Sequence, residues 1–247
     1  MQLRDSLKLM RWELEEYTAF PLLEVLIMVA IYSILTMPLG EIDVAKSYSN
    51  LHWGIERVFL FLIFGVGAVF SHSFAGSFAK GEIKLLLSYP VKRWQLFLSK
   101  FTALFLVLFA VYGAVFSVQV YILSLSPFEP MFYVSLLGLL LQLLFFCSIT
   151  VTFSLITKNE IISILVSILL LYGLENIVSS GSYWSSTGQF RIIFGYFGYL
   201  THGELPTGLM MNPTLENLAL AISIPLALSA ILLSASLLYF TRVMEID

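Results

Sequence analysis

The chain has little of what most enzymes use for chemistry. Of its 247 residues only one is a cysteine and three are histidines. A single cysteine excludes an internal disulfide and any site that needs several thiolates. Cys147 lies among leucine and phenylalanine residues, where a thiol behaves as a small hydrophobic side chain, so we expect it to serve packing rather than reactivity.

Motifs for phosphate binding, zinc ligation and nucleophilic catalysis are also missing. No G-x-x-x-x-G-K-[ST] loop occurs, and Lys80-Gly81 has those two residues in reverse order. His202-Gly203-Glu204 lacks the spacing that places two zinc ligands on one helical face. No G-x-S-x-G turn is found either. We therefore expect no catalysis, no metal site and no cofactor in this chain.

Charged residues are scarce as well. They make up 12% of the chain, against 59% hydrophobic residues, and the mean hydropathy is +0.91. A soluble domain has about 25% charged and roughly 45–50% apolar residues. So much apolar surface cannot be hidden in one core, which predicts an all-α integral membrane protein. The net charge of −3, with basic residues in separate segments, gives no surface for nucleic acid.

Six apolar segments are long enough to cross a membrane, since roughly 20 helical residues span a hydrocarbon core of about 30 Å. They are residues 20–39, 55–78, 96–123, 131–156, a segment that begins at Ile161, and residues 218–240. Residues 1–19 precede them and carry one apolar stripe with charges on the other faces, which predicts an amphipathic helix lying at the membrane surface. Residues 20–247 form the membrane domain, and no cleavable signal peptide is expected.

Lysine and arginine residues predict the orientation, because they are retained on the cytoplasmic side. With both termini in the cytoplasm, ten of the thirteen lie inside: Arg4, Lys8, Arg11, Lys80, Lys84, Lys92, Arg93, Lys100, Lys158 and Arg242. Only Lys46, Arg57 and Arg191 then lie outside. The location expected is the cytoplasmic membrane.

The fifth span is short. Only fourteen residues separate Glu160 from Glu175, and they rise roughly 21 Å as a helix. Residues 176–214 follow and are rich in both aromatic residues and glycine, which suits the membrane boundary better than an aqueous loop. We expect short re-entrant or interfacial helices that form an outer lid. Glu175 then either lies at membrane depth, in a pathway or a buried pair, or reaches the outer headgroups.

The spans hold few other polar side chains. Tyr112, Gln119 and Gln142 are candidates for a transport pathway or the lid, together with Glu175. For Gln142 the alternative is an interhelical hydrogen bond, which is the commoner role of such a residue. His72 is interpreted as a packing histidine rather than a proton carrier. With at most one mid-membrane carboxylate, the chain does not resemble an ion-driven pump, so its energy source should lie elsewhere.

The segment 78–100 holds five of the thirteen basic residues between two apolar runs. Gly81 can begin a short helix, Leu85 and Leu86 offer it an apolar face, and Pro90 ends it. The basic residues that follow can return to the headgroups. Topology alone would explain the charges but not this arrangement of glycine, leucines and proline.

These residues resemble the first cytoplasmic loop of ABC-2 type transporter permeases, the membrane subunits of ATP-binding-cassette exporters. The resemblance rests on Lys80, Gly81, Glu82, Lys84, Leu85, Leu86, Ser88, Pro90, Arg93 and Lys100. One departure is Phe78-Ala79, where the family usually has charged residues. The six-span plan with a surface helix and a broken segment after a short fifth span is similar too.

The resemblance implies an exporter permease without ATPase activity of its own. The loop would act as a coupling helix that docks on a cytoplasmic ATPase, with two such subunits binding ATP and Mg²⁺. A second copy of the chain, or a homologous permease, would complete the pathway within the membrane lipids. A lipid-like, amphipathic or bulky substrate is expected. The alternatives are a non-transporting scaffold that docks a cytoplasmic partner and an intramembrane enzyme.

Overall fold

The computed structural model describes residues 11, 31, 62–83, 92–122, 124, 126–177, 184–202 and 214–243. Every regular element in these residues is a helix, as predicted. Apart from Arg11 and Ile31, the surface helix 1–19 and the first span 20–39 lie outside the described residues.

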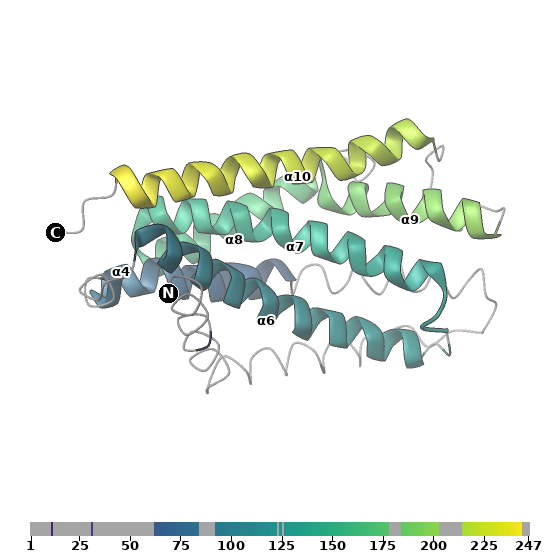
Figure 1. Ribbon diagram of the computed structural model, residues 1–247, viewed down its shortest axis with the longest axis horizontal. Coiled ribbons are helices and arrows are strands. Elements are labelled where there is room, and N and C mark those ends of the chain that lie inside the picture. Colours follow the sequence, from purple (N-terminus) through teal and green to yellow (C-terminus); the bar gives the residue numbers. More distant parts are fainter. Residues whose placement is uncertain are drawn as a thin grey trace.

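The helices follow one another along the chain in a simple order (Figure 1). The first of the described helices, Leu62–Ala79, is called the first helix below. It contains the π-helical turn η1 and the short α4. The bounds of the labelled elements are η1 His72–Gly76, α4 Ser77–Ala79, α6 Arg93–Ile122, α7 Pro130–Thr157, α8 Glu160–Ile177, α9 Ser186–His202, α10 Leu215–Leu238 and η2 Tyr239–Val243.

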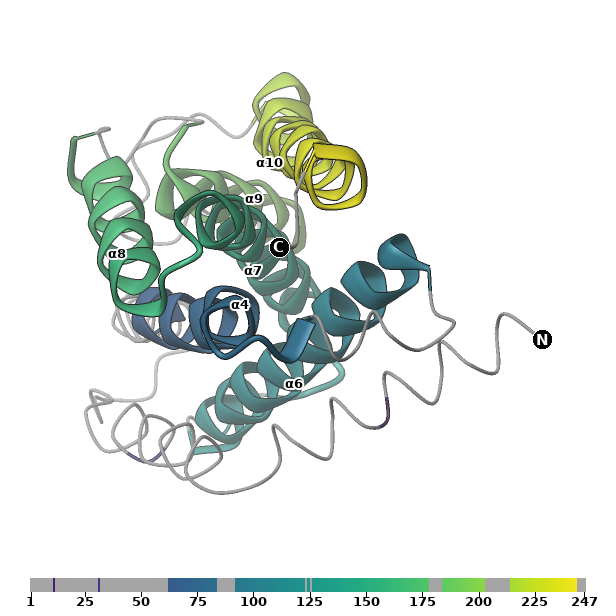
Figure 2. The ribbon, with the colours of Figure 1, turned by 90° about the vertical axis from the view of Figure 1, so that its left-hand side faces the viewer.

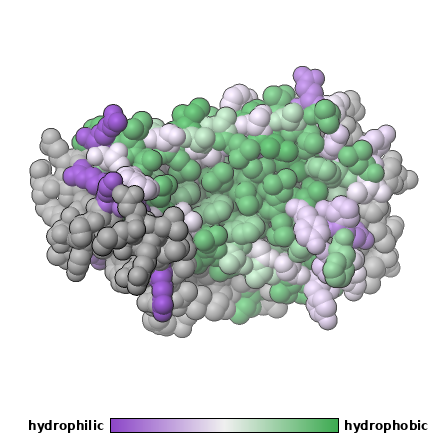
Figure 3. All heavy atoms as spheres, in the orientation of Figure 1, coloured by the Kyte–Doolittle hydropathy of each residue, from purple (hydrophilic) through white to green (hydrophobic). Residues whose placement is uncertain are grey.

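Four helices in the described part of the chain are long and apolar enough to cross a membrane. They are Leu62–Ala79, Arg93–Ile122, Pro130–Thr157 and Leu215–Val243. They correspond to the predicted second, third, fourth and sixth spans. Figure 3 shows a broad apolar surface over the middle of the molecule, with polar residues toward its two ends. The chain is thus a multi-pass, all-helical membrane protein.

Helix α7 lies in the middle of the bundle (Figure 2). It contacts α6, α8, α9, α10 and η1. The end of the bundle that holds α4, η2 and the turn between α7 and α8 is called the α4 end below, and the opposite end is called the α9 end (Figure 1).

A two-residue turn joins α7 to α8 at the α4 end. Lys158 has a φ of +51° in the left-handed region and its amide bonds the Ser154 carbonyl, which ends α7. Asn159 then accepts the Ile162 amide at 3.2 Å with its side chain, which satisfies one of the free amides at the start of α8. The two helices therefore form a tight antiparallel hairpin.

Helix α9 is the helix that the structure describes within the predicted lid, and it has 17 residues. The expectation of short re-entrant or interfacial helices that form an outer lid is not confirmed. Phe190 of α9 contacts Gly138, and Phe194 packs with Met131, so later residues of α9 meet earlier residues of α7. Because α9 thus runs antiparallel to α7, it continues in the direction of α8 toward the α9 end. Its buried Phe190 and Phe194 hold it along α7.

Aromatic rings dominate the core at the α4 end. Phe70 and Phe74 of the first helix pack edge-on against Phe101 and Phe97 of α6, with ring centroids 5.6 Å apart in both pairs. Phe97 also contacts Phe240 of η2 at 5.8 Å. These rings join the second, third and sixth predicted spans where the segment 78–100 begins.

Candidate functional site

Gly81 ends the first helix and points the chain into the predicted coupling loop. Its amide donates to the Phe78 carbonyl at 3.1 Å, and its φ of +72° lies in the left-handed region. Among the residues that the structure describes, no atom lies within 4 Å of where a Cβ would stand, whereas the positive φ by itself favours glycine. Glu82 and Ile83 resume helical geometry directly after it.

Phe78, at the position where the resembling family has charged residues, faces the aromatic core. Its ring lies 6.1 Å from that of Phe240 in an edge-on arrangement. Ile83, on the other side of Gly81, is buried in the same core cluster. Lys80, in contrast, is exposed. The start of the loop is therefore anchored on both sides of a turn that projects a basic side chain.

The far end of the predicted loop enters the bundle. Arg93 begins α6, and Lys100 lies two turns further along it. Lys100 is only 4% exposed, and its Nζ donates to Ser77 Oγ of α4 at 3.1 Å. This ammonium lies among the helices rather than in the headgroups. The remaining predicted loop residues, Lys84, Leu85, Leu86, Ser88 and Pro90, lie outside the described residues.

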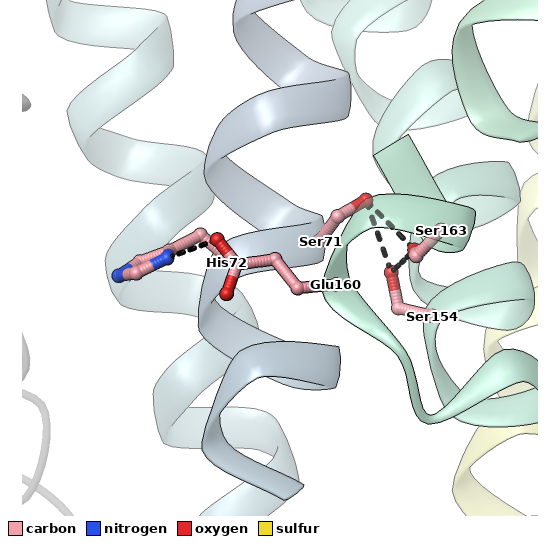
Figure 4. Close-up of polar contacts among 5 residues, drawn as sticks. All are labelled: Ser71, His72, Ser154, Glu160 and Ser163. Carbon is pink, nitrogen blue, oxygen red and sulfur yellow. Dashed lines mark hydrogen bonds and ion pairs between the residues drawn. The ribbon is translucent and has the colours of Figure 1, made fainter. Parts of the chain in front are cut away.

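Directly after the α7–α8 turn, the first residue of α8 contacts a histidine of the first helix (Figure 4). Glu160 Oε1 lies 2.6 Å from His72 Nδ1, and both side chains are partly exposed. Gly76 lets them approach, since a Cβ there would stand 2.9 Å from Glu160 Oε2. His72 and Gly76 bound the π-helical turn η1, and such turns are frequent at functional positions.

Three serine hydroxyls form a buried cluster beside this pair. Ser163 of α8 lies 2.8 Å from Ser71 of the first helix and 2.7 Å from Ser154 of α7, measured between Oγ atoms (Figure 4). Ser154 also donates to the Thr150 carbonyl at 2.7 Å. Buried hydroxyl bonds of this kind hold membrane helices close together. The cluster and the His72–Glu160 contact together join the first helix to the α7–α8 hairpin.

Glu175, near the other end of α8, binds the start of α9. Its carboxylate accepts the Ser186 amide at 2.7 Å, the Ser185 hydroxyl at 2.8 Å, and both the amide and the hydroxyl of Thr187 at 3.3 and 2.8 Å. The first amides of a helix have no partner within it, and a negative charge there is favourable. Glu175 therefore serves as the cap of α9.

The position of Glu175 along the bundle follows from the hairpin. Glu175 lies fifteen residues after Glu160, and Gln142 lies fifteen before Thr157, which places each roughly 22 Å from the turn. The 28 residues of α7 extend about 42 Å. Glu175 is thus about halfway along α7, well short of the α9 end. Its depth in a membrane, at the level of the lipid or at the outer headgroups, stays a prediction.

Gln142 of α7 also contacts the start of α9. Its Nε2 donates to the Ser186 carbonyl at 3.2 Å, while its Oε1 and the Ser186 hydroxyl are buried and have no hydrogen-bond partner among the described residues. The structure therefore brings together two of the four candidate pathway residues. Tyr112 and Gln119 are buried on α6, where Tyr112 lies against Gly65.

Sequence reasoning missed the serine cluster and the role of Glu160. Ser154 and Ser163 stand at nearly equal distances from the turn at 158–159, which is a usable signal for contact across a helical hairpin. His72 and Glu160 are separated by 88 residues, and no pattern in one sequence joins them.

A comparison with protein families matches residues 9–174 to a model described as ABC-2 family transporter protein. The match covers about two thirds of the chain, from the N-terminal region through the body of α8. The chain belongs to the ABC-2 transporter family. Searches among curated proteins and among solved structures find no match.

Family membership implies a partner for this chain. ABC-2 family proteins are membrane components of ABC transporters, and membership implies association with an ABC ATPase. The matched range contains the whole segment 78–100 as well as His72 and Glu160, while α9 and α10 lie beyond it.

Proposed function

We propose that this ABC-2 family protein is the permease subunit of an exporter driven by a separate ATPase. Two ATPase subunits bind at the α4 end and hydrolyse ATP, and a second permease copy or a homologue completes the pathway. The strongest support is the family match, whose range includes the segment 78–100. Near the start of that segment lie the exposed Lys80 and Gly81 with its left-handed backbone.

The α4 end faces the cytoplasm in this proposal, and both termini are cytoplasmic. Its support is the distribution of basic residues, which are retained on the cytoplasmic side. Those described at the α4 end are Lys80, Lys92, Arg93, Lys158 and Arg242. The turn at Gly81 then directs residues 82–90 toward the ATPase as a coupling helix.

Gln142 and Glu175 belong to the interior of the permease, and the substrate is amphipathic. The broad apolar surface and the 12% share of charged residues suit such a molecule better than a bare ion. Transport of a fluorescent phospholipid and of a small cation by the same proteoliposomes tests this class. Cation transport without lipid transport would contradict it.

Co-purification and ATP hydrolysis test the proposed function. Tagged protein should bring down an ATPase with a phosphate-binding loop. Leu85→Asp or Glu82→Ala should leave insertion intact while removing the stimulation of ATP hydrolysis by the permease. Glu216→Ala, on the exposed first turn of α10, is the matched control and should keep full stimulation. Failure to recover any ATPase would contradict the proposal and favour a scaffold.

A further inference from the structure

Helix α8 is held at both ends by its own carboxylates. Glu160, in its first turn, contacts His72 of the first helix at 2.6 Å. Glu175, about 22 Å along the helix, accepts bonds from Ser185, Ser186 and Thr187 at the start of α9. Each carboxylate thus joins α8 to a different helix.

The two contacts lead in opposite directions along the molecule. The first helix continues through α4 and Gly81 into the proposed coupling segment. Helix α9 packs along the other half of α7 toward the α9 end. A displacement of the first helix at the α4 end can therefore reach α9 through α8.

The contacts near Glu160 are close enough to pass a displacement of the first helix on to α8. Gly76 admits the carboxylate against η1, and the Ser71–Ser163 bond lies beside it. In contrast, the remaining side of α8 is exposed, with Ile161, Leu165 and Leu169 facing away from the bundle. The helix is held by its ends and by one face, so it can move as a unit with the helices bound to its ends.

We propose that α8 transmits movement from the coupling segment to α9, with Glu160 and Glu175 as positioning residues for transport. The proposal rests on the proposed function for the source of the movement. Within the chain it makes one requirement. Loss of the His72–Glu160 contact must weaken the hydrogen bonds that Glu175 accepts from the start of α9.

Amide hydrogen exchange can measure that dependence. The amides of Ser186 and Thr187 lie in the first turn of α9, where no carbonyl of the same helix can accept them, so their protection depends on Glu175. The full chain is reconstituted in nanodiscs of phosphatidylcholine and phosphatidylglycerol, and exchange is followed in peptides that cover α9.

Glu175→Ala should raise exchange at Ser186 and Thr187 at least tenfold. Glu160→Ala should raise it there about threefold or more, although the substitution lies some 22 Å away. His72→Ala should have the same effect as Glu160→Ala, and the two together should add little, because they remove one contact. Exchanging the partners, His72→Glu with Glu160→His, should restore protection, whereas Glu216→Ala should change nothing at α9.

A rise confined to the first turn of α8 and to η1 in Glu160→Ala and His72→Ala would overturn the proposal. A second set of exchange measurements, made on the complex with the ATPase, distinguishes this outcome from failure of the proposed function. With the ATPase bound, ATP and vanadate should change exchange in α9, and Glu160→Ala should reduce that change. If the unsubstituted complex gives no ATP response, the proposed function fails, while the exchange in the isolated chain still decides the role of α8.

Discussion

At the scale of single residues, glycines determine where helices can turn or touch. Gly81 takes a left-handed conformation and has no described atom close to its Cβ position, whereas Gly138 has ordinary helical geometry and a phenylalanine ring against it. The first is required by the backbone and the second by packing. Substitution by different residues separates the two requirements.

At Gly81, alanine should destabilise the start of the coupling segment. A left-handed conformation costs a residue with a Cβ about 1–2 kcal/mol, and asparagine tolerates it better than alanine. Gly81→Ala should therefore speed amide exchange at residues 80–83 by roughly fivefold or more, and Gly81→Asn should do so less. Equal or larger effects of asparagine would mean that space, not conformation, is limiting.

Gly113, in the interior of α6, provides the control. The nearest atom to a Cβ at this position is a Leu136 methyl carbon at 4.0 Å. Alanine in an unstrained helix is favoured over glycine by roughly 0.5–1 kcal/mol. Gly113→Ala should therefore leave exchange at residues 80–83 unchanged and should not lower the unfolding free energy.

At the scale of elements, close packing and polar contacts join helices far apart in the chain. The ring of Phe190 lies so close to Gly138 that a Cβ there would overlap it. This contact, with the Glu175 cap, holds α9 along α7. A sequence rich in glycine and aromatic residues at 176–214 indicated something other than a simple loop, but not a helix antiparallel to α7.

Gly138→Ala should weaken the packing of α9 on α7. Overpacking a filled site costs about 1–3 kcal/mol, and a smaller partner should relieve it. We expect a lower unfolding free energy in mixed micelles for Gly138→Ala, and partial recovery when Phe190→Leu is added. Additive losses in the double variant would show that the two residues do not share one contact.

At the scale of the whole molecule, the other helices surround α7 (Figure 2). Polar contacts lie at both ends of α8. Basic residues gather at the α4 end, which we assign to the cytoplasm. The assignment predicts which exposed positions a membrane-impermeant reagent can reach in intact cells. The only native cysteine, Cys147, is buried and gives little background.

Two single-cysteine variants test the orientation in a Cys147→Ala background. Tyr199→Cys, on the exposed part of α9, should react with an impermeant maleimide in intact cells. Asn159→Cys, in the exposed α7–α8 turn, should react only after permeabilisation. The reverse pattern would contradict cytoplasmic termini and place the segment 78–100 on the outside.

Much of the fold could be predicted because local properties decide it. Apolar runs of about 20 residues must be helical in lipid, since every backbone group needs an internal partner. Helices were thus expected close to where α6, α7 and α10 lie, and the resemblance in residues 80–100 agrees with the family match. Gly81 was expected to begin a short helix, and in the structure its left-handed turn lies directly before the helical residues Glu82 and Ile83.

The rest depended on which distant side chains meet. His72 was interpreted as a packing residue and Glu160 had no assigned role, yet they form one contact across 88 residues. Glu175 had no expected partner, and the structure shows it accepting the Ser186 amide at the start of α9. By itself, the sequence determined the lipid environment and the helices, since hydropathy is a property of each segment. Tertiary packing alone decided how α8 is held and where α9 runs, because those follow from contacts between segments.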